Sequence, residues 1–468
     1  MVAAHDEASS KGHMVRLINA RQANGDGFAM EIAAGRIVSV TTTDNKEKLQ
    51  DVSRASLMSV GDFAALPEAT VVDAGGRILL PAAIDVHVHS RDPGLTHKED
   101  WHTLARGAWR GGVIAVADMP NTLPPMMTRS SVMEKAARAR ASGLEHAFFL
   151  GVGLSNINDL RGLLLDPELP LCGLKVFYGR TTGELLYDDL ETLARVLPDH
   201  GEKVVVFHSE DQCTIDCNHQ RFGRQLHETN NAAFAVHSAI RSSDAAHTST
   251  RAILEWARTT YRRPIHIAHI STALEVELVA EARARGVPVT CEVAPHHLLF
   301  STADYERLGP LVKMNPPLRA PEEVEALSRL FAQGAIEIFA TDHAPHTLAE
   351  KYADVAHSPS GVPGVELFYQ LLITCSNRFG LPLERAVAMA SAAPAKLLGW
   401  HHKGSLAPGN DADFVVLGDE EHTILSQDVV SKCGWTPYAG WHVPRDVLAT
   451  WNRGRQVYCG SHHETGVS

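Results

Sequence analysis

Long apolar runs are absent from this chain of 468 residues, and basic residues are in deficit. No run approaches the ~18 consecutive apolar residues that a membrane-spanning helix needs. The first dozen residues, MVAAHDEASSKG, lack the apolar centre of a secretion signal. Lys and Arg number 43 against 55 Asp and Glu, for a net charge of -12, whereas nucleic-acid and membrane-surface binders need a basic surface. We therefore expect neither a nucleic-acid nor a membrane partner.

Cysteine is also scarce: the chain has 7, an odd number, scattered along its length. This usage does not indicate a disulfide framework in so long a chain, and we expect a reduced, cytoplasmic protein. Cys213, Cys217 and His219 mimic a metal-site spacing, but we favour no structural metal there. The 44% hydrophobic and 21% charged residues exclude global disorder. Histidine is abundant, at 26, and it is the commonest metal ligand and an acid or base near neutral pH.

The middle of the chain, about residues 80–395, alternates short apolar runs with helix-like stretches. The eight apolar runs are Ile84–Val88, Val113–Ala117, Ala147–Val152, Leu174–Tyr178, Val204–Phe207, Ile265–His269, Val287–Glu292 and Ile336–Ala340. The stretches between them include Glu99–Arg110, Ser131–Ala141, Ala273–Arg285 and Glu322–Phe331. Strands that alternate with helices indicate parallel βαβ units. The eight runs therefore predict an α/β fold with a (β/α)8 TIM-type barrel, whose active site lies at the C-terminal strand ends.

The two ends of the chain show a different pattern from the middle. Residues 14–79 alternate with period 2 between Gly, Asn and Asp residues, which is typical of short antiparallel strands. The chain after Gly404 returns to this pattern. We therefore predict a small β-sandwich domain of residues 1–79 and 396–468, beside a barrel of residues 80–395.

One connection within the predicted barrel is unusually long. It runs from about Glu210 to Arg263, which is too long for a bare loop. Helices at Asn230–Ile240 and Ser249–Arg258 are expected to fill most of it.

The strongest local signal is IDVHVHSRDPG, at the end of the first predicted barrel strand. His87 and His89 stand at i and i+2, so both side chains point to one face of a strand and can reach one metal. An isolated pair of this kind is more often two strand histidines that are hydrogen-bonded to their neighbours. The interpretation changes here because similar residues end other predicted strands.

Four more residues of metal-site chemistry end or follow predicted strands: Lys175, His208, His269 and Asp342. A buried, unpaired lysine in a strand is costly, but its carbamate is a carboxylate that can bridge two cations. Together with the two histidines above, these residues predict a binuclear metal site. Histidine and carboxylate ligands fit zinc, while Mn, Co and Fe remain open.

With these motifs the chain resembles the cyclic-amidohydrolase branch of the amidohydrolase superfamily, and most closely the dihydroorotases. The matching pieces are IDVHVHSRDPGLTHKED, GGVIAVADMPNTLPP, LKVFYG, FHSED, HIAHIST, VTCEVAPHHLLFS, VKMNPPLR, ATDHAPHTLAEK and SGVPGVE. They cover nearly the whole chain and are specific as a set, although each alone is weak. THKED and VTCEVAPHH look like the dihydroorotase domain of the animal multifunctional pyrimidine enzyme.

The resemblance implies a role for each metal-site residue. His87, His89 and Asp342 would hold one divalent ion, His208 and His269 would hold the other, and Lys175 would bridge them as N6-carboxylysine. Glu292 and His297 match positions of an additional metal site in the animal enzyme, but Ala268 stands where that enzyme has a neighbouring cysteine. A third metal therefore stays open.

The resemblance also implies the substrate contacts, which are Arg91, Asn121, Asn315, His346 and Thr181. A guanidinium can fork onto a carboxylate, and dihydropyrimidinases and hydantoinases have no counterpart of this arginine. Two neighbours depart from the family pattern, because Ser90 replaces a bulky aliphatic residue and Asp92 replaces glutamate. Thr182 replaces an aromatic residue in the loop 179–184, so closure of that loop is expected to differ.

The implied reaction is the reversible hydrolysis of the cyclic amide of (S)-dihydroorotate to N-carbamoyl-L-aspartate, in pyrimidine (UMP) biosynthesis. A metal-bridged hydroxide would attack the amide, with Asp342 as base and then acid. The alternatives are a hydantoinase, dihydropyrimidinase or allantoinase, and a non-catalytic homologue that scaffolds a transcarbamoylase. The expected partners are the small-molecule substrate, further copies of the chain in a homodimer or higher oligomer, and aspartate transcarbamoylase.

Overall fold

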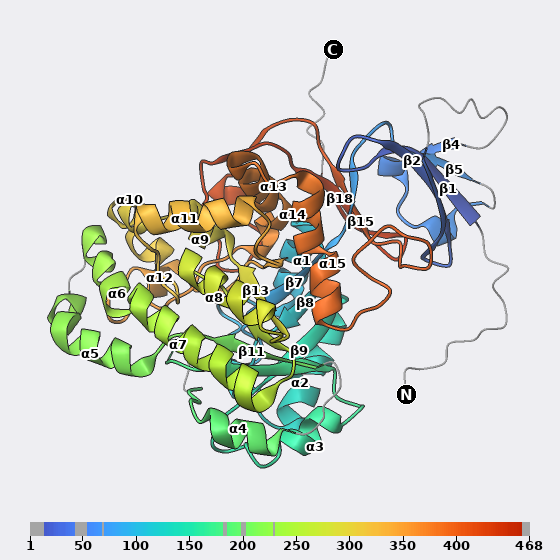
Figure 1. The fold of residues 1–468 in the computed structure, drawn as a ribbon. Helices are drawn as coiled ribbons and strands as arrows, with labels where there is room; N and C mark the ends of the chain where they lie inside the picture. Colours follow the sequence, from blue (N-terminus) through green and yellow to red (C-terminus); the bar gives the residue numbers. More distant parts are fainter. Residues whose placement is uncertain are drawn as a thin grey trace.

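The chain folds around one large sheet, flanked by smaller sheets at its side (Figure 1). The structure is a computed structural model that describes residues 14–42, 54–67, 70–180, 185–197, 203–227 and 230–460. Within these ranges, no helix is long and apolar enough to cross a membrane.

The large sheet is a barrel of eight parallel strands, each paired with its neighbour in sequence. The strands are β7 (Ala83–Val88), β8 (Val113–Asp118), β9 (Glu145–Gly151), β10 (Leu171–Phe177), β11 (Val204–His208), β12 (Ile265–Ile267), β13 (Val289–Val293) and β14 (Ile338–Phe339). Most strand residues are buried, which explains why these strands are near-continuous apolar runs rather than alternating ones. A bridge from Val88 in the first strand to His343, in the segment that follows the last strand, leaves the barrel nearly closed.

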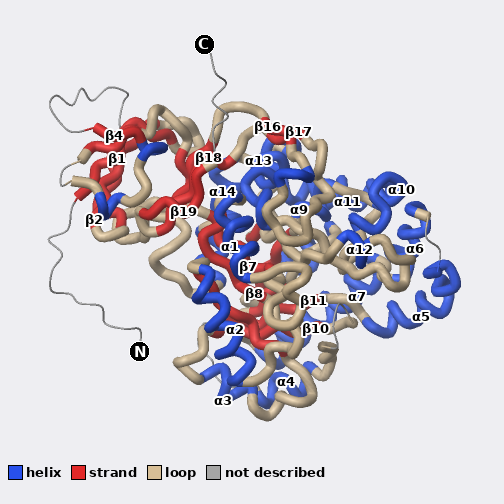
Figure 2. Tube along the Cα trace, turned by 180° about the vertical axis from the view of Figure 1, so that it is seen from behind, coloured by secondary structure: helices blue, strands red, loops and turns tan. Residues whose placement is uncertain are grey.

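Helices cover the outside of the barrel (Figure 2). They are α1 (Trp101–Arg110), α2 (Arg129–Ser142), α3 (Leu160–Leu165), α4 (Leu190–Val196), α5 (Gln212–Phe222), α6 (Ala235–Ile240), α7 (Ser243–Trp256), α8 (Ala273–Ala284), α9 (Pro295–Leu299), α10 (Tyr305–Leu308), α11 (Pro321–Ala332), α12 (Leu348–Lys351), α13 (Phe368–Phe379), α14 (Leu383–Ala390) and α15 (Ala392–Leu397). Helix α2 is fixed at both ends: the Thr128 side chain caps its first turn, and Gly143 ends it in the left-handed region at φ +80°.

Strands from both ends of the chain form the flanking sheets. One sheet has the order β3-β2-β1-β5-β4, and a second has the order β19-β18-β15-β6. Their strands are β1 (Met14–Arg21), β2 (Gly27–Ala33), β3 (Arg36–Thr42), β4 (Arg54–Ser56), β5 (Val71–Asp73), β6 (Leu79–Pro81), β15 (Phe414–Leu417), β18 (Val447–Asn452) and β19 (Arg455–Cys459), while β16 (His422–Thr423) pairs with β17 (His442–Val443). Trp451 stacks on Phe63 and Phe414, at ring distances of 4.5 and 5.5 Å, in a core between the two sheets.

The predicted α/β barrel with terminal β sheets is confirmed, and all eight predicted strands overlap observed ones. The exact division into residues 1–79 with 396–468 and residues 80–395 stays a proposal. In the long connection, the predicted helix at Asn230–Ile240 is α6 preceded by a 3-10 turn at Asn231–Phe234. The predicted helix at Ser249–Arg258 begins earlier, as α7, and ends in a π turn at Ala257–Tyr261.

Candidate active site

A small cavity lies at the C-terminal ends of the barrel strands. It is lined by His87, His89, Arg91, Asn121, Lys175, Phe177, His208, His269, Asn315, Asp342, Ala344, Ser360 and Gly361. All six residues expected to bind metal are among them, because parallel strands end on one side of a barrel. Arg91, Asn121 and Asn315 also line it, whereas His346 does not and Thr181 lies outside the described residues.

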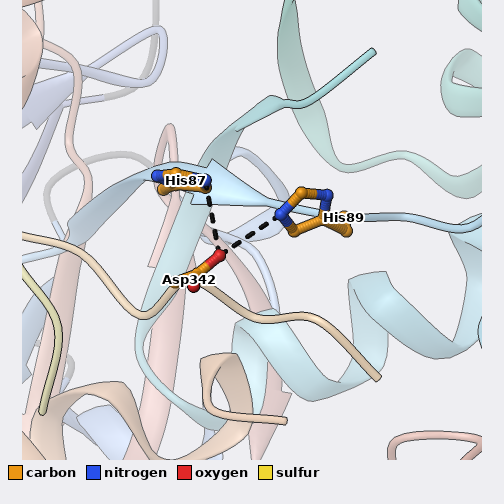
Figure 3. Close-up of side chains that lie close together, drawn as sticks. All are labelled: His87, His89 and Asp342. Carbon is orange, nitrogen blue, oxygen red and sulfur yellow. Dashed lines mark hydrogen bonds and ion pairs between the residues drawn. The ribbon is translucent and has the colours of Figure 1, made fainter. Parts of the chain in front are cut away.

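Three of these side chains form a compact group (Figure 3). Asp342 Oδ1 lies 3.2 Å from His89 Nε2 and 3.4 Å from His87 Nε2. Within the described part of the chain, this is the group of His, Cys, Asp or Glu side chains whose atoms converge closely enough to hold a metal ion. Both histidines present Nε2 to the same carboxylate, as their i, i+2 spacing predicts.

The other ring nitrogen of His87 is held by Glu292, a buried carboxylate on β13. The distance from His87 Nδ1 to Glu292 Oε1 is 2.5 Å. Glu292 also bonds His266 Nε2 at 3.0 Å and accepts the His269 amide at 3.1 Å. Burial opposes its ionisation, but His87 and His266 outweigh burial and hold the pKa of Glu292 below its usual value. An ionised carboxylate only accepts, so His87 carries its proton on Nδ1 and offers a lone pair on Nε2.

A second carboxylate orients His208 in the same way. His208 Nε2 lies 2.8 Å from Glu210 Oε2, and Glu210 is paired with Arg241. His208 therefore offers Nδ1 to the cavity, and this atom lies 3.0 Å from His269 Nε2. Two ring nitrogens that face each other at this distance require a proton or a cation between them. The other nitrogen of His269, Nδ1, has no hydrogen-bond partner among the described residues.

The four histidines are held in the neutral form that binds metals. Burial lowers the pKa of His87 and His208, and lowers that of His89 and His269 well below the usual 6.5. A histidine must be deprotonated on the nitrogen that binds a metal. Carboxylate partners on the far ring nitrogens are typical of metal-binding histidines, because they fix the ring and its tautomer.

Lys175 is the most unusual member of the cavity. Its side chain is fully buried on β10, and Nζ has no hydrogen-bond partner within the described residues. Burial lowers the pKa of Lys175 to about 8, so a larger fraction of this amine is neutral near neutral pH than of an ordinary lysine. A neutral amine is the form that adds CO2, and the carbamate would replace an orphaned nitrogen with two ligand oxygens. The donor set as a whole therefore fits divalent cations.

Arg91 brings a guanidinium to the cavity. Its Nε donates to the Pro345 carbonyl at 3.1 Å, and Nη2 lies 3.0 Å from His346 Nε2. Nη1 has no partner among the described residues. Burial lowers the pKa of Arg91 to about 10, so the guanidinium stays charged at neutral pH. The cavity therefore offers a charged donor to an anionic group.

The backbone is strained at three of the lining residues. Arg91, His269 and Asp342 have φ values of +61°, +34° and +47°, in the left-handed region that side chains other than glycine rarely adopt. Such conformations cost ~1–3 kcal/mol each and persist where the surroundings impose them, often at functional sites. Their concentration at one cavity indicates that the fold is built to aim these side chains.

His346 lies behind Arg91 rather than on the cavity wall. Its Nδ1 is 3.1 Å from Lys98 Nζ, and Trp435 Nε1 donates to its carbonyl at 2.7 Å. Burial and the neighbouring Arg91 lower the pKa of His346 well below its usual value. Its substrate contact stays a prediction, and its observed contact is the support of Arg91. His346 follows β14 in an irregular segment, where no periodicity indicates which way a side chain points.

The two asparagines expected at the substrate are both on the wall with their oxygens engaged. Asn121 Oδ1 lies 2.6 Å from His89 Nδ1, which leaves His89 Nε2 as the lone-pair nitrogen. Asn315 Oδ1 lies 2.9 Å from His237 Nε2. Both side-chain oxygens are therefore engaged with histidines of the protein.

Within the part of the chain that the structure describes, the residues that the sequence suggested for additional metal sites do not lie close enough together to hold a metal ion. His297 Nε2 contacts the Pro316 carbonyl at 3.0 Å, and Glu292 is engaged by His87 and His266. In the described ranges, neither the Glu292 and His297 positions nor the Cys213, Cys217 and His219 positions form a metal-holding group.

Sequence reasoning missed Glu210 and Arg241, which orient His208. A signal for Glu210 was present in FHSED, because Glu210 stands two residues after His208 and alternation places both on one face. Arg241 had no such signal, since it directly follows α6 in the long connection, 31 residues beyond Glu210.

Comparison with known proteins places the chain in a family. Residues 212–457 match the model of the Amidohydrolase family. The chain is 38% identical over 401 residues to a dihydroorotase from Halobacterium salinarum, covering 85% of this chain and 90% of that one. It is 34% identical over 405 residues to a dihydroorotase from Methanosarcina acetivorans, at 83% and 84% coverage. A dihydroorotase from Lactobacillus gasseri is 33% identical over 398 residues, at 83% and 90% coverage.

Solved structures share the fold. The L-hydantoinase (dihydropyrimidinase) from Arthrobacter aurescens superposes with a TM-score of 0.83 at 23% identity, covering 95% of both chains. The dihydropyrimidinase from Brevibacillus agri NCHU1002 gives a TM-score of 0.77 at 22% identity, again at 95% coverage of both. These structures show the fold alone, whereas the sequence relationship shows that the chain belongs to the amidohydrolase superfamily and, within it, to the dihydroorotases.

Proposed function

We propose that this chain catalyses the reversible hydrolysis of the ring amide of (S)-dihydroorotate to N-carbamoyl-L-aspartate. The observation that carries the proposal is the buried guanidinium of Arg91, whose Nη1 is unpaired within the described residues beside the histidine and aspartate group. Dihydroorotate is a cyclic amide with a carboxylate, so it needs both a hydrolytic group and a cation. The curated relatives named dihydroorotase support the same substrate.

Two divalent ions, with zinc as our choice, would be held by this cavity. His87, His89 and Asp342 would hold one, His208 and His269 would hold the other, and carboxylated Lys175 would contribute to both. When bound, such ions supply a nucleophile at neutral pH by lowering the pKa of water, and they polarise a carbonyl oxygen. The lone-pair nitrogens, the orphaned Lys175 Nζ and the facing pair of His208 and His269 support this assignment.

Asp342 is the proposed proton carrier. Burial raises the pKa of its carboxyl group, although His87 and Lys175 oppose the shift. A raised pKa makes a carboxylate a better base. One Asp342 oxygen takes a proton from the nucleophile, and the same oxygen then returns that proton to the leaving ring nitrogen.

Arg91 binds and orients the substrate carboxylate in this proposal. Nη1 donates to one carboxylate oxygen, while Nε stays on Pro345 and fixes the plane of the guanidinium. The further proposed substrate contacts are Asn121, Asn315, Thr181 and His346. Anchoring the carboxylate brings the ring amide to Asp342 in one orientation, which supplies part of the rate acceleration.

Hydrolysis of hydantoin or dihydropyrimidine rings is the second candidate, because the hydantoinases share the fold. A site for such uncharged rings has no use for a buried guanidinium beside the reacting groups, and this observation favours dihydroorotate. We further propose a cytoplasmic enzyme of pyrimidine biosynthesis that forms a homo-oligomer and associates with aspartate transcarbamoylase. A non-catalytic scaffold is not favoured, since every expected ligand position lines the cavity.

Removal and return of metal tests the proposed function. Protein purified without chelator should interconvert dihydroorotate and N-carbamoyl-L-aspartate, lose this activity on dialysis against a chelator, and regain it with Zn2+, Mn2+ or Co2+. Full turnover by a metal-free preparation, or no turnover by a preparation that holds two ions per chain, would overturn it.

A further inference from the structure

Helix α2 contacts the chain on both sides of Arg91. Lys135 and Arg138 stand three residues apart on this helix, so they share one face. One of them reaches Ser90 through a carboxylate, and the other reaches Asp92 directly. Arg91 lies between these two anchored residues.

The first anchor is fully buried. Ser90 donates its amide to Asp118 Oδ1 and its hydroxyl to Asp118 Oδ2, both at 2.8 Å. Lys135 Nζ pairs with the same carboxylate and donates to the Met119 carbonyl at 2.9 Å. Ser90, Asp118 and Lys135 are each 0% exposed, so the ion pair is shielded from solvent and from screening.

The second anchor lies nearer the surface. Arg138 Nη1 donates to Asp92 Oδ1 at 3.2 Å, and its Nη2 donates to Glu134 Oε1 at 3.0 Å. The Asp92 side chain is 10% exposed and that of Arg138 is 46% exposed. Arg138 is half exposed, so its replacement removes the hydrogen bond to the buried Asp92 carboxylate without removing a core side chain.

Both anchors act on a residue in a rare backbone conformation. Arg91 has a φ of +61°, which an arginine keeps only where its neighbours impose it. The side chain of Ser90 bonds Asp118, whereas His89 and Arg91 line the cavity.

We propose that Lys135, through Asp118 and Ser90, and Arg138, through Asp92, are positioning residues that hold Arg91 in its strained conformation and aim its guanidinium at the substrate carboxylate. The inference rests on the proposed function for the identity of that carboxylate. According to this proposal, helix α2 contributes to substrate selection from the outside of the barrel, because it sets the geometry of Arg91 without touching the substrate.

Ser90→Ala and Arg138→Met test the two anchors separately. Ser90→Ala removes one hydrogen bond to a buried carboxylate and leaves the Lys135–Asp118 pair in place. Each variant should raise KM for dihydroorotate about 10-fold, which corresponds to ~1.4 kcal/mol of binding free energy. Metal content and kcat should stay within about 2-fold of wild type. Arg138→Lys, which keeps the charge, should restore most of the lost affinity.

Arg140→Met is the matched control, because Arg140 lies on α2 and shows no ion pair or side-chain hydrogen bond among the described residues. Its KM should equal that of wild type. A purely structural role of the anchors would lower the melting temperature and leave KM unchanged. That result for both Ser90→Ala and Arg138→Met would overturn the inference.

Crystal structures give a readout that does not depend on turnover. The metal-loaded Ser90→Ala variant should show Arg91 displaced or distributed over two backbone conformations. If Arg91 keeps its position and its φ near +61° in both variants, the inference fails whatever the substrate is. If wild type does not turn over dihydroorotate, the proposed function fails, and the position of Arg91 in the variants still decides the inference.

Discussion

Arg91→Lys is the change that most directly separates charge from geometry at the proposed carboxylate site. Lysine keeps one positive charge but lacks the planar fork that matches a carboxylate with parallel hydrogen bonds. In the wild type, Nε donates to Pro345 and Nη2 contacts His346, so the guanidinium plane is fixed before substrate arrives. A lysine side chain has a single nitrogen. It therefore cannot keep the contacts with Pro345 and His346 and also donate to the substrate carboxylate in the place of Nη1.

The magnitude follows from the bonds lost. The substitution removes the hydrogen bond that Nη1 would donate to the carboxylate. It also removes the contacts with Pro345 and His346 that fix the position of the side chain. One hydrogen bond to a charged group contributes about 1.5–3 kcal/mol. We therefore expect kcat/KM for dihydroorotate to fall roughly 10- to 150-fold. Metal content should stay close to wild type, because Arg91 is not a proposed ligand.

The assay compares a charged ring with an uncharged ring in both proteins. Wild type and Arg91→Lys are measured with (S)-dihydroorotate and with dihydrouracil, and metal is determined on the same samples. Turnover of dihydrouracil should be slow in both proteins and nearly unaffected by the change. A silent Arg91→Lys, or an equal loss on both rings, would refute the assignment of Arg91 to a carboxylate.

Three further changes have distinct expected outcomes. Lys175→Ala should lose metal and nearly all activity, with partial rescue by short carboxylic acids; full metal occupancy without rescue would contradict the carbamate. Glu292→Gln should weaken metal binding by about 10- to 100-fold in titrations, because His87 loses the carboxylate that fixes its tautomer, and unchanged affinity would contradict that role. Burial raises the pKa of Asp85 from 3.8 to about 7. Between pH 3.8 and 7 the folded state therefore keeps a proton that the unfolded state has lost. The folded state loses stability relative to the unfolded state as the pH rises through this range. The free energy of unfolding of metal-free Asp85→Asn, relative to that of wild type, should therefore increase between pH ~4 and 7 by a total on the order of 4 kcal/mol. Denaturant titrations that give the same difference between the two proteins at every pH would contradict this.

The barrel was predictable because its strands are buried on both faces. Runs such as Val204–Phe207 are continuous in β-branched and aromatic residues, and this pattern separates them from the amphipathic helices between them. Strand ends were less predictable: Ile265–His269 is a strand only as far as Ile267, because the chain turns into the left-handed region at His269. Such a turn is imposed by tertiary contacts such as the bond from the His269 amide to Glu292, which no local pattern encodes.

The candidate site was predictable to the extent that it follows strand geometry. His87 and His89 were placed correctly on the cavity wall because alternation in a strand fixes the direction of both side chains. His346 lies behind Arg91, since its segment follows β14 without regular structure. The contacts of Ser90 with Asp118 and of Asp92 with Arg138 join segments 28 and 46 residues apart. The first contact depends on the register of β7 with β8 and the second on how α2 packs, and the sequence pattern alone indicates neither.

The central claim is that the cavity recognises a cyclic amide with a carboxylate, and a substrate panel tests it most directly. The measurement is kcat/KM of the metal-loaded wild type for (S)-dihydroorotate, dihydrouracil, hydantoin and allantoin under identical conditions. The account predicts that dihydroorotate exceeds every uncharged ring by at least about 10-fold, the smallest loss expected for one hydrogen bond to a charged group. Turnover of dihydrouracil or hydantoin equal to that of dihydroorotate would contradict it.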